Sequence, residues 1–161
     1  MRRWLEPVVV ASVALLDQAT KLLVVSDLGL HQTVEIIPGL LNLTHVRNSG
    51  VAFGILNATS FAFKPALMAA LAMAALVGVA LYSTQLSLEQ RWARAGLALI
   101  LGGAAGNLVD RARQGYVVDF VDAYWGSWHF WAFNVADAAI TVGVGILVLD
   151  LLRPARPVSA G

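Results

Sequence analysis

Long apolar runs, interrupted at intervals by single acidic, basic or amide side chains, dominate this chain. A membrane-spanning helix requires about 20 mostly apolar residues, within a range of about 17–25. The runs that approach this length cover residues 8–25, 66–82, 95–111 and 130–152. The pattern therefore predicts four transmembrane helices, packed together so that their polar groups avoid lipid.

Residues 33–46, between the first and second runs, follow a different pattern. Two short and partly apolar stretches flank Pro38 and Gly39, and Pro-Gly suits the centre of a type II turn. We expect two strands joined by this turn, lying on the membrane surface. The predicted fold class is thus an all-α membrane protein with four transmembrane helices and a small extracytoplasmic β-element.

Composition supports a membrane environment. Hydrophobic residues make up 58% of the chain and charged residues 13%, whereas a soluble domain has roughly 45–50% and about 25%. The net charge of +1 argues against a basic nucleic-acid-binding surface. The absence of cysteine excludes a disulfide scaffold, a thiol nucleophile and a thiolate metal site.

The distribution of Lys and Arg near the predicted span ends indicates the orientation. On the side that holds both termini lie Arg2, Arg3, Arg91, Arg94, Arg153 and Arg156. On the other side lie Arg47, Lys64, Lys21, Arg111 and Arg113. This modest excess predicts cytoplasmic termini. The start resembles a signal peptide, but the polar segment Asp17–Lys21 interrupts it, so we expect an uncleaved first helix.

Ionisable residues inside the apolar runs are candidates for function, because each costs about 2.5–3.5 kcal/mol at the centre of a membrane helix. Asp17 and Lys21 are four residues apart and can form an ion pair on one helix face. Asp110 can pair with Arg111, or both can serve a site. Asp137 has no cation nearby in the sequence, so it demands another explanation.

The motifs exclude several chemistries. No G-x-S-x-G or H-E-x-x-H occurs, and the three histidines are scattered. Two aspartates about 3 Å apart can share one proton and hydrolyse a peptide bond without metal or cofactor, but spacing alone leaves open which two meet. A small transporter and a non-catalytic membrane assembly protein are the alternatives, since both also place polar groups between membrane helices.

Five segments in chain order carry a family resemblance: Asp17–Lys21, Asn48–Phe53, Gly102–Arg111, Val117–Phe120 and Phe133–Asp137. With them, the chain resembles lipoprotein signal peptidase, the type II signal peptidase of bacteria. The resemblance covers nearly the whole chain and implies a single integral-membrane peptidase domain over residues 1–161.

The resemblance implies an aspartyl endopeptidase of the bacterial cytoplasmic (inner) membrane, blocked by globomycin. Its substrate would be a diacylglyceryl-modified prolipoprotein, cut just before the lipid-bearing cysteine near the extracytoplasmic face. The catalytic pair maps onto Asp119 and Asp137. The family's other motif positions, which line or brace the pocket, map onto Asp17, Lys21, Asn48, Gly50, Asn107, Asp110, Arg111 and Asn134.

The same resemblance implies a flexible outer loop over roughly residues 121–131. We expect no metal and no cofactor. The expected partners are the prolipoprotein substrate and membrane lipid, with no nucleic acid, and we expect the protein to be a monomer.

Overall fold

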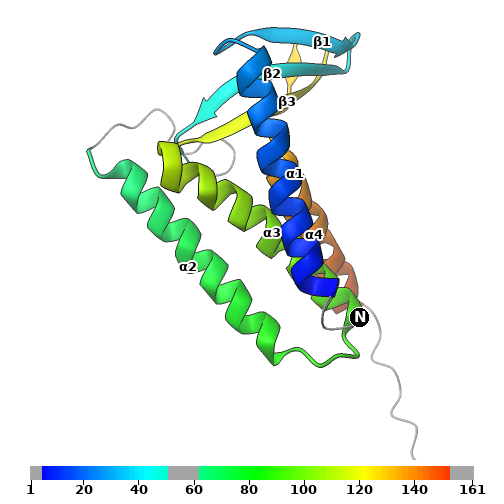
Figure 1. Ribbon diagram of the computed structural model, residues 1–161. Helices are drawn as coiled ribbons and strands as arrows, with labels where there is room; N and C mark the ends of the chain where they lie inside the picture. The colour runs from blue at the N-terminus through cyan, green and yellow to red at the C-terminus, as the bar shows by residue number, and fades with distance from the viewer. Residues whose placement is uncertain (1–4, 51–61, 153–161) are drawn as a thin grey trace, which may run out of the picture.

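The computed structural model describes residues 5–50 and 62–152 of the chain. In chain order the elements are α1 (Leu5–Asp27), β1 (Thr33–Ile37), β2 (Leu41–Asn48), α2 (Lys64–Gln85), α3 (Arg91–Gln114), β3 (Val117–Trp125), β4 (Trp128–His129) and α4 (Val135–Leu151). The helices form an elongated group, and the sheet lies beyond the ends of α1 and α3 (Figure 1). The mostly helical fold with a small β-element is confirmed.

Helix α3 lies at the centre and contacts α1, α2 and α4. Small residues allow this, because a glycine lets two helix backbones approach closely. A Cβ atom on Gly102 would lie 2.7 Å from Cβ of Val13 in α1. Gly96 in α3 and Gly143 in α4 face each other, so that a Cβ on either would collide with the carbonyl oxygen of the other. The Gly- and Ala-rich sequence of α3 thus determines where three helices meet.

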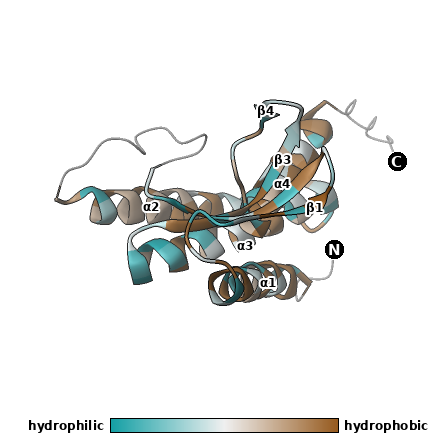
Figure 2. Cartoon of the chain, turned by 90° about the horizontal axis from the view of Figure 1, so that it is seen from above, coloured by the Kyte–Doolittle hydropathy of each residue, from teal (hydrophilic) through white to brown (hydrophobic). Residues whose placement is uncertain are grey.

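Three helices, α1, α2 and α3, are long and apolar enough to cross a membrane. Their large apolar side chains face outwards, and Leu15 and Leu22 of α1 are 70% and 62% exposed. Hydrophobic residues predominate along α1 when the molecule is viewed from above (Figure 2). Such exposure is expected of helices that face lipid.

The fourth predicted run differs from the structure at its start. Helix α4 has 17 residues and begins at Val135, not near residue 130. The preceding residues are extended, and the N–H of Phe133 donates to the carbonyl oxygen of Val121 in β3. Aromatic residues favour such half-buried pairing, and hydropathy alone does not separate them from a helix. Asp137 accordingly lies in the first turn of α4.

The sheet is larger than the sequence predicts. The expected turn is confirmed, because Gly39 has φ of 76° and the N–H of Leu40 donates to the carbonyl oxygen of Ile37. However, the strand order is β1-β2-β3-β4, with antiparallel pairing throughout. Most of residues 121–131, expected to form an outer loop, lie in this sheet, because β3 and β4 form a hairpin there. The flexibility of this segment stays a prediction.

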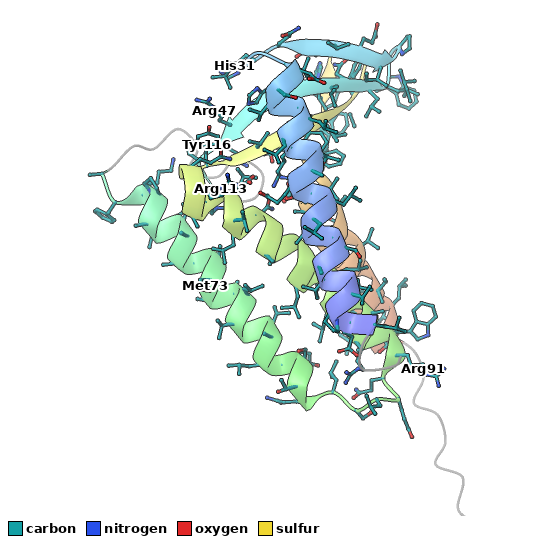
Figure 3. The ribbon with its side chains drawn as sticks, viewed as in Figure 1. His31, Arg47, Met73, Arg91, Arg113 and Tyr116 are labelled. Atoms are coloured by element: carbon teal, nitrogen blue, oxygen red, sulfur yellow. The ribbon has the colours of Figure 1, made fainter. Side chains whose placement is uncertain are left out.

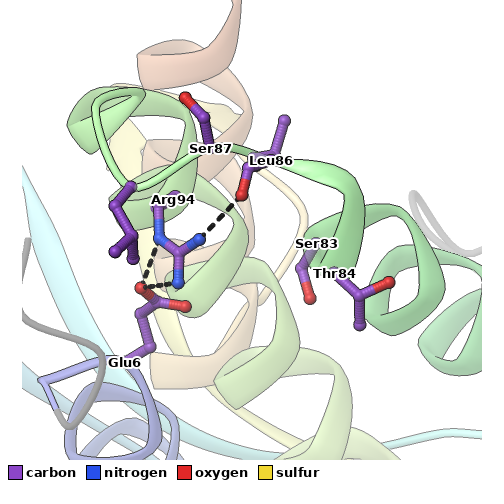
Figure 4. A pocket seen from close by; sticks show the side chains of 7 residues that line it. Glu6, Ser83, Thr84, Leu86, Ser87 and Arg94 are labelled. Carbon is purple, nitrogen blue, oxygen red and sulfur yellow. Dashed lines mark hydrogen bonds and ion pairs between the residues drawn. The ribbon is translucent and has the colours of Figure 1, made fainter.

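A separate polar contact lies at the end of the helices away from the sheet. Figure 3 shows Arg91 at this end, far from His31 and Arg47. The guanidinium of Arg94 donates to the carboxylate of Glu6 at 2.5 Å and to the carbonyl oxygen of Leu86 at 3.0 Å (Figure 4). These groups line a cavity of about 390 Å³ with Ser83, Thr84, Ser87 and Leu88. The contact connects α1 to the loop between α2 and α3.

Two glycines of α4 offer a matched test of helix packing. A Cβ on Gly143 would lie 2.5 Å from the carbonyl oxygen of Gly96, whereas one on Gly145 would meet nothing within 4 Å. We predict that Gly143→Ala lowers the free energy of unfolding by about 1–3 kcal/mol, because backbone must move to make room. Gly145→Ala should leave it unchanged or raise it. Thermal unfolding in detergent measures both, and equal midpoints would refute the proposed close contact.

Candidate active site

Asp119 of β3 and Asp137 of α4 meet through a pair of asparagine side chains. The Nδ2 atom of Asn134 donates to Oδ1 of Asp119 at 2.7 Å and to Oδ1 of Asn107 at 3.2 Å. The Nδ2 atom of Asn107 in turn donates to Oδ1 of Asp137 at 2.8 Å. The two carboxyl groups, 18 positions apart in the chain, are thus each one hydrogen bond from the same pair of amides.

The start of α4 sets the position of Asp137. Asn134 has an extended backbone (φ −133°, ψ −176°), and its Oδ1 accepts the N–H of Asp137 at 2.9 Å. This is helix N-capping, in which a side-chain oxygen satisfies a free N–H of the first turn. A second free N–H, that of Ala136, donates to Oδ1 of Asp17 in α1 at 3.0 Å. The beginning of α4 is therefore held by its own cap and by a neighbouring helix.

Lys21 connects the helices behind the two carboxyl groups. Its Nζ atom contacts Asp17 at 2.8 Å, Asp110 at 2.9 Å and Oδ1 of Asn107 at 2.8 Å. Its side chain is only 4% exposed, so all three ammonium donors are used inside the protein. The predicted pair of Asp17 and Lys21 is confirmed, and Lys21 has a second acidic partner on α3.

The alternative in which Asp110 pairs with Arg111 is wrong within the described part of the chain. Oδ2 of Asp110 instead accepts from Lys21 and from the backbone N–H of Val118, at 3.1 Å, where β3 begins. Neighbouring residues of a helix point in different directions, and Lys21 offers a buried partner. Asp110 therefore joins α3 both to α1 and to the strand that carries Asp119.

Arg111 and Asn48 connect the end of β2 to the same region. The guanidinium of Arg111 donates to the carbonyl oxygen of Gly50 at 3.2 Å, and Oδ1 of Asn48 accepts the N–H of Gly50 at 3.0 Å. Nδ2 of Asn48 donates to Oδ2 of Asp119 at 3.0 Å. Both oxygens of Asp119 thus accept amide donors. Residues 51–53 of this motif lie outside the described residues.

Gln18 is a member of the network that sequence reasoning did not single out. Its Nε2 atom donates to Oδ1 of Asp110 at 2.9 Å and to the carbonyl oxygen of Gly106 at 3.1 Å. A signal was present, because a side-chain amide between Asp17 and Lys21 in an apolar run also needs partners. All ten candidate residues from the sequence contact this one network.

The surroundings of Asp119 favour its protonated form. Asp119 is only 2% exposed to solvent. Burial, followed by the nearby charge of Asp137, raises the pKa of Asp119 to about 7, although hydrogen bonds from Asn48 and Asn134 act in the opposite direction. An aspartate that titrates near neutral pH can donate a proton and can also accept one.

Asp122 and His129 lie apart from this network. Nδ1 of His129 lies 2.9 Å from Oδ1 of Asp122, and Nδ2 of Asn42 donates to Oδ2 of Asp122 at 2.9 Å.

Within residues 5–50 and 62–152, no group of three His, Cys, Asp or Glu side chains is arranged so that it could hold a metal ion.

Comparison with known proteins shows which family this chain resembles. A sequence model of the family described as signal peptidase (SPase) II matches residues 9–153. The chain is 44% identical over 149 residues to a lipoprotein signal peptidase of Geobacter metallireducens, covering 92% of this chain and 91% of that one. The corresponding protein of Solibacter usitatus is 45% identical over 157 residues, with coverages of 96% and 94%. A solved structure described as a bacterial membrane enzyme superposes with a TM-score of 0.85 at 27% identity, covering 98% of this chain and 96% of that one.

The apolar helices and these matches identify a bacterial membrane protease. The chain belongs to the signal peptidase II family, the lipoprotein signal peptidases. The resemblance read from the five motifs is thereby confirmed, and the protease is favoured over the transporter and the assembly protein.

Loss of Lys21 tests the network behind the site. We predict that Lys21→Met lowers the free energy of unfolding by about 3–5 kcal/mol, because it leaves two buried carboxylates without their cation. Arg91→Met, at an exposed position, should change it by less than about 0.5 kcal/mol. Thermal or denaturant unfolding in detergent compares the two. If Lys21→Met unfolds like the control, the ammonium does not stabilise the fold.

Proposed function

We propose that this protein is an aspartyl endopeptidase that removes the signal peptide of diacylglyceryl-modified prolipoproteins, cutting before the lipid-bearing cysteine. Asp119 and Asp137 form its catalytic pair. The observation that carries this proposal is the convergence of these two carboxyl groups on the amides of Asn107 and Asn134. Family membership supports the substrate class.

The two aspartates take different parts in the reaction. Asp119, whose pKa is raised to about 7, donates its proton to the oxygen of the scissile carbonyl. Asp137, in the first turn of α4, takes the part of the ionised member, because the hydrogen bond donated by Nδ2 of Asn107 favours its charged form. It takes a proton from the attacking water, which gives a gem-diol, and passes this proton to the leaving nitrogen. As the C–N bond breaks, one hydroxyl of the gem-diol returns a proton to Asp119, so that the pair is restored. Water is thereby added across the peptide bond without a covalent intermediate, metal or cofactor.

The remaining residues brace this pair. Asn107 and Asn134 orient the two carboxyl groups, and Asn48 holds the second oxygen of Asp119. Arg111 and Gly50 fix the end of β2 against α3. Asp17, Lys21 and Asp110 hold α1, α3, β3 and α4 in the arrangement that brings the pair together.

We further propose that the whole chain is one integral-membrane peptidase domain with four spans. Helix α4 is the fourth, because it lies beside α3 and its 17 residues reach the lower limit for a span. The termini are cytoplasmic, and the sheet and the site lie at the extracytoplasmic face of the inner membrane. There the acyl chains of a substrate remain in lipid while its peptide bond meets water. The enzyme acts as a monomer, since one chain carries the whole network.

Substitution of either aspartate tests the catalytic pair. We predict that Asp119→Asn and Asp137→Asn each lower kcat/KM by about 10²–10⁴-fold or more, because proton transfer is lost while size is kept. Cleavage of a diacylglyceryl prolipoprotein by purified protein in detergent, with and without globomycin, provides the measurement.

Asp122→Asn is the matched control, since Asp122 lies three residues from Asp119 on the same strand and outside the network. Its activity should stay within about threefold of the starting protein. Substantial cleavage by a folded Asp119→Asn or Asp137→Asn protein would remove that residue from the pair.

The pH dependence of cleavage tests the protonated role of Asp119. Activity should fall as the pH rises through about 7, where Asp119 loses its proton. Asn48 donates to the charged form of this carboxyl group, so Asn48→Ala should raise its pKa and move the alkaline limb of kcat/KM up by about one pH unit. Stability has the matching sign: burial of Asp119 makes the fold less stable as the pH rises from about 4 to 7.

Asn42→Ala is the control, because it removes an equivalent amide from Asp122 on the same strand. Its alkaline limb should coincide with that of the starting protein. A limb that stays in place in Asn48→Ala, or moves equally in both variants, would contradict the role of Asp119.

A further inference from the structure

Five basic residues lie at or near the end of the molecule that carries the sheet, and three of them have acceptors inside the protein. Lys21 contacts two carboxylates, Arg111 donates to backbone carbonyl oxygens, and Lys64 donates to the hydroxyl of Ser49 at 3.1 Å. The other two are Arg47 of β2 and Arg113 in the last turn of α3. Both of these are exposed.

In the described residues, no carboxylate oxygen lies within 4.0 Å of the guanidinium group of Arg47 or of Arg113. The stretches of sequence outside the described ranges contain no Asp or Glu. The guanidinium groups of Arg47 and Arg113 therefore have no carboxylate side chain as a partner.

A tyrosine connects the two positions. The guanidinium of Arg47 lies over the ring of Tyr116, 4.7 Å from its centroid, which fixes its orientation through a cation–π contact. Tyr116 follows Arg113 by three residues, across the left-handed Gly115 that ends α3. Figure 3 shows Arg47, Tyr116 and Arg113 near one another, where the sheet joins the helices.

This is the level at which α3, a helix long enough to span a bilayer, reaches its end. Lipid headgroups lie at this level, and tyrosine is enriched there. The planar guanidinium group binds phosphate with two parallel hydrogen bonds.

We propose that Arg47, Arg113 and Tyr116 form a binding site for the phosphodiester headgroup of an anionic phospholipid; we call it the headgroup site. A bound lipid would hold the end of β2 and the start of β3 at the membrane surface. These segments carry Asn48 and Asp119, so the site lies next to the proposed catalytic pair. The headgroup site does not depend on which side of the membrane the sheet lies, because both faces of a bilayer carry lipid phosphates. It does not depend on the catalytic roles of Asp119 and Asp137 either, because neither residue belongs to it.

Native mass spectrometry of the full chain tests the headgroup site. The protein is released from micelles that contain equal amounts of phosphatidylglycerol and phosphatidylcholine, and the retained lipids are counted. We expect phosphatidylglycerol to be preferred. Arg47→Gln and Arg113→Gln should each reduce its retention relative to phosphatidylcholine about fivefold, the effect of one basic side chain near an anionic surface.

Arg91→Gln is the matched control, because it removes one exposed arginine from the opposite end of the same helix as Arg113. It should retain phosphatidylglycerol as the starting protein does. Equal retention by all variants, or an equal loss in Arg91→Gln, overturns the proposal. The side chain of Arg113 is exposed and forms no hydrogen bond or ion pair with the described residues, so this variant should fold and unfold normally. Prolipoprotein cleavage by Arg113→Gln in detergent, measured separately, then distinguishes failure of the headgroup site from failure of the proposed activity.

Discussion

The arrangement of this protein depends on one buried ammonium group. A charge removed from water costs several kcal/mol unless excellent partners surround it, and Lys21 has three, on α1 and α3. Two of these partners extend the network further. Asp17 accepts the N–H of Ala136 at the start of α4, and Asp110 accepts the N–H of Val118 at the start of β3. The elements that carry both candidate catalytic aspartates are thus connected to the same cation.

The network also explains why the two aspartates contact amides and not cations. Asn107 accepts from Lys21 through its oxygen and donates to Asp137 through its nitrogen. The ammonium group is thereby kept one side chain away from the carboxyl pair. A direct contact with Lys21 would favour ionisation of both carboxyl groups, whereas hydrolysis by an aspartate pair requires a shared proton. Burial and the nearby charge of Asp137 are then sufficient to raise the pKa of Asp119 to about 7.

Close helix packing makes this network possible. A Cβ on Gly106 would lie 2.5 Å from Oδ2 of Asp17, and a Cβ on Gly102 would lie 2.7 Å from Cβ of Val13. Any larger residue at these positions would separate α1 from α3, and the hydrogen bonds across that interface would lengthen. The small residues of α3 therefore serve the site as much as the fold, although none of them takes part in the proposed chemistry.

The sequence by itself determined the apolar runs, the turn at Pro38 and Gly39, the pairing of Asp17 with Lys21 and the family. Each depends on residues that are neighbours in the chain or on motifs in a fixed order. Only the tertiary structure decided that Asp110 pairs with Lys21 and not with Arg111, that β3 and β4 replace a loop, and that Asn134 begins α4 directly before Asp137. These features arise from hydrogen bonds between distant segments. Hydropathy and periodicity describe local preference, and they carry no information about which distant partner satisfies a buried polar group.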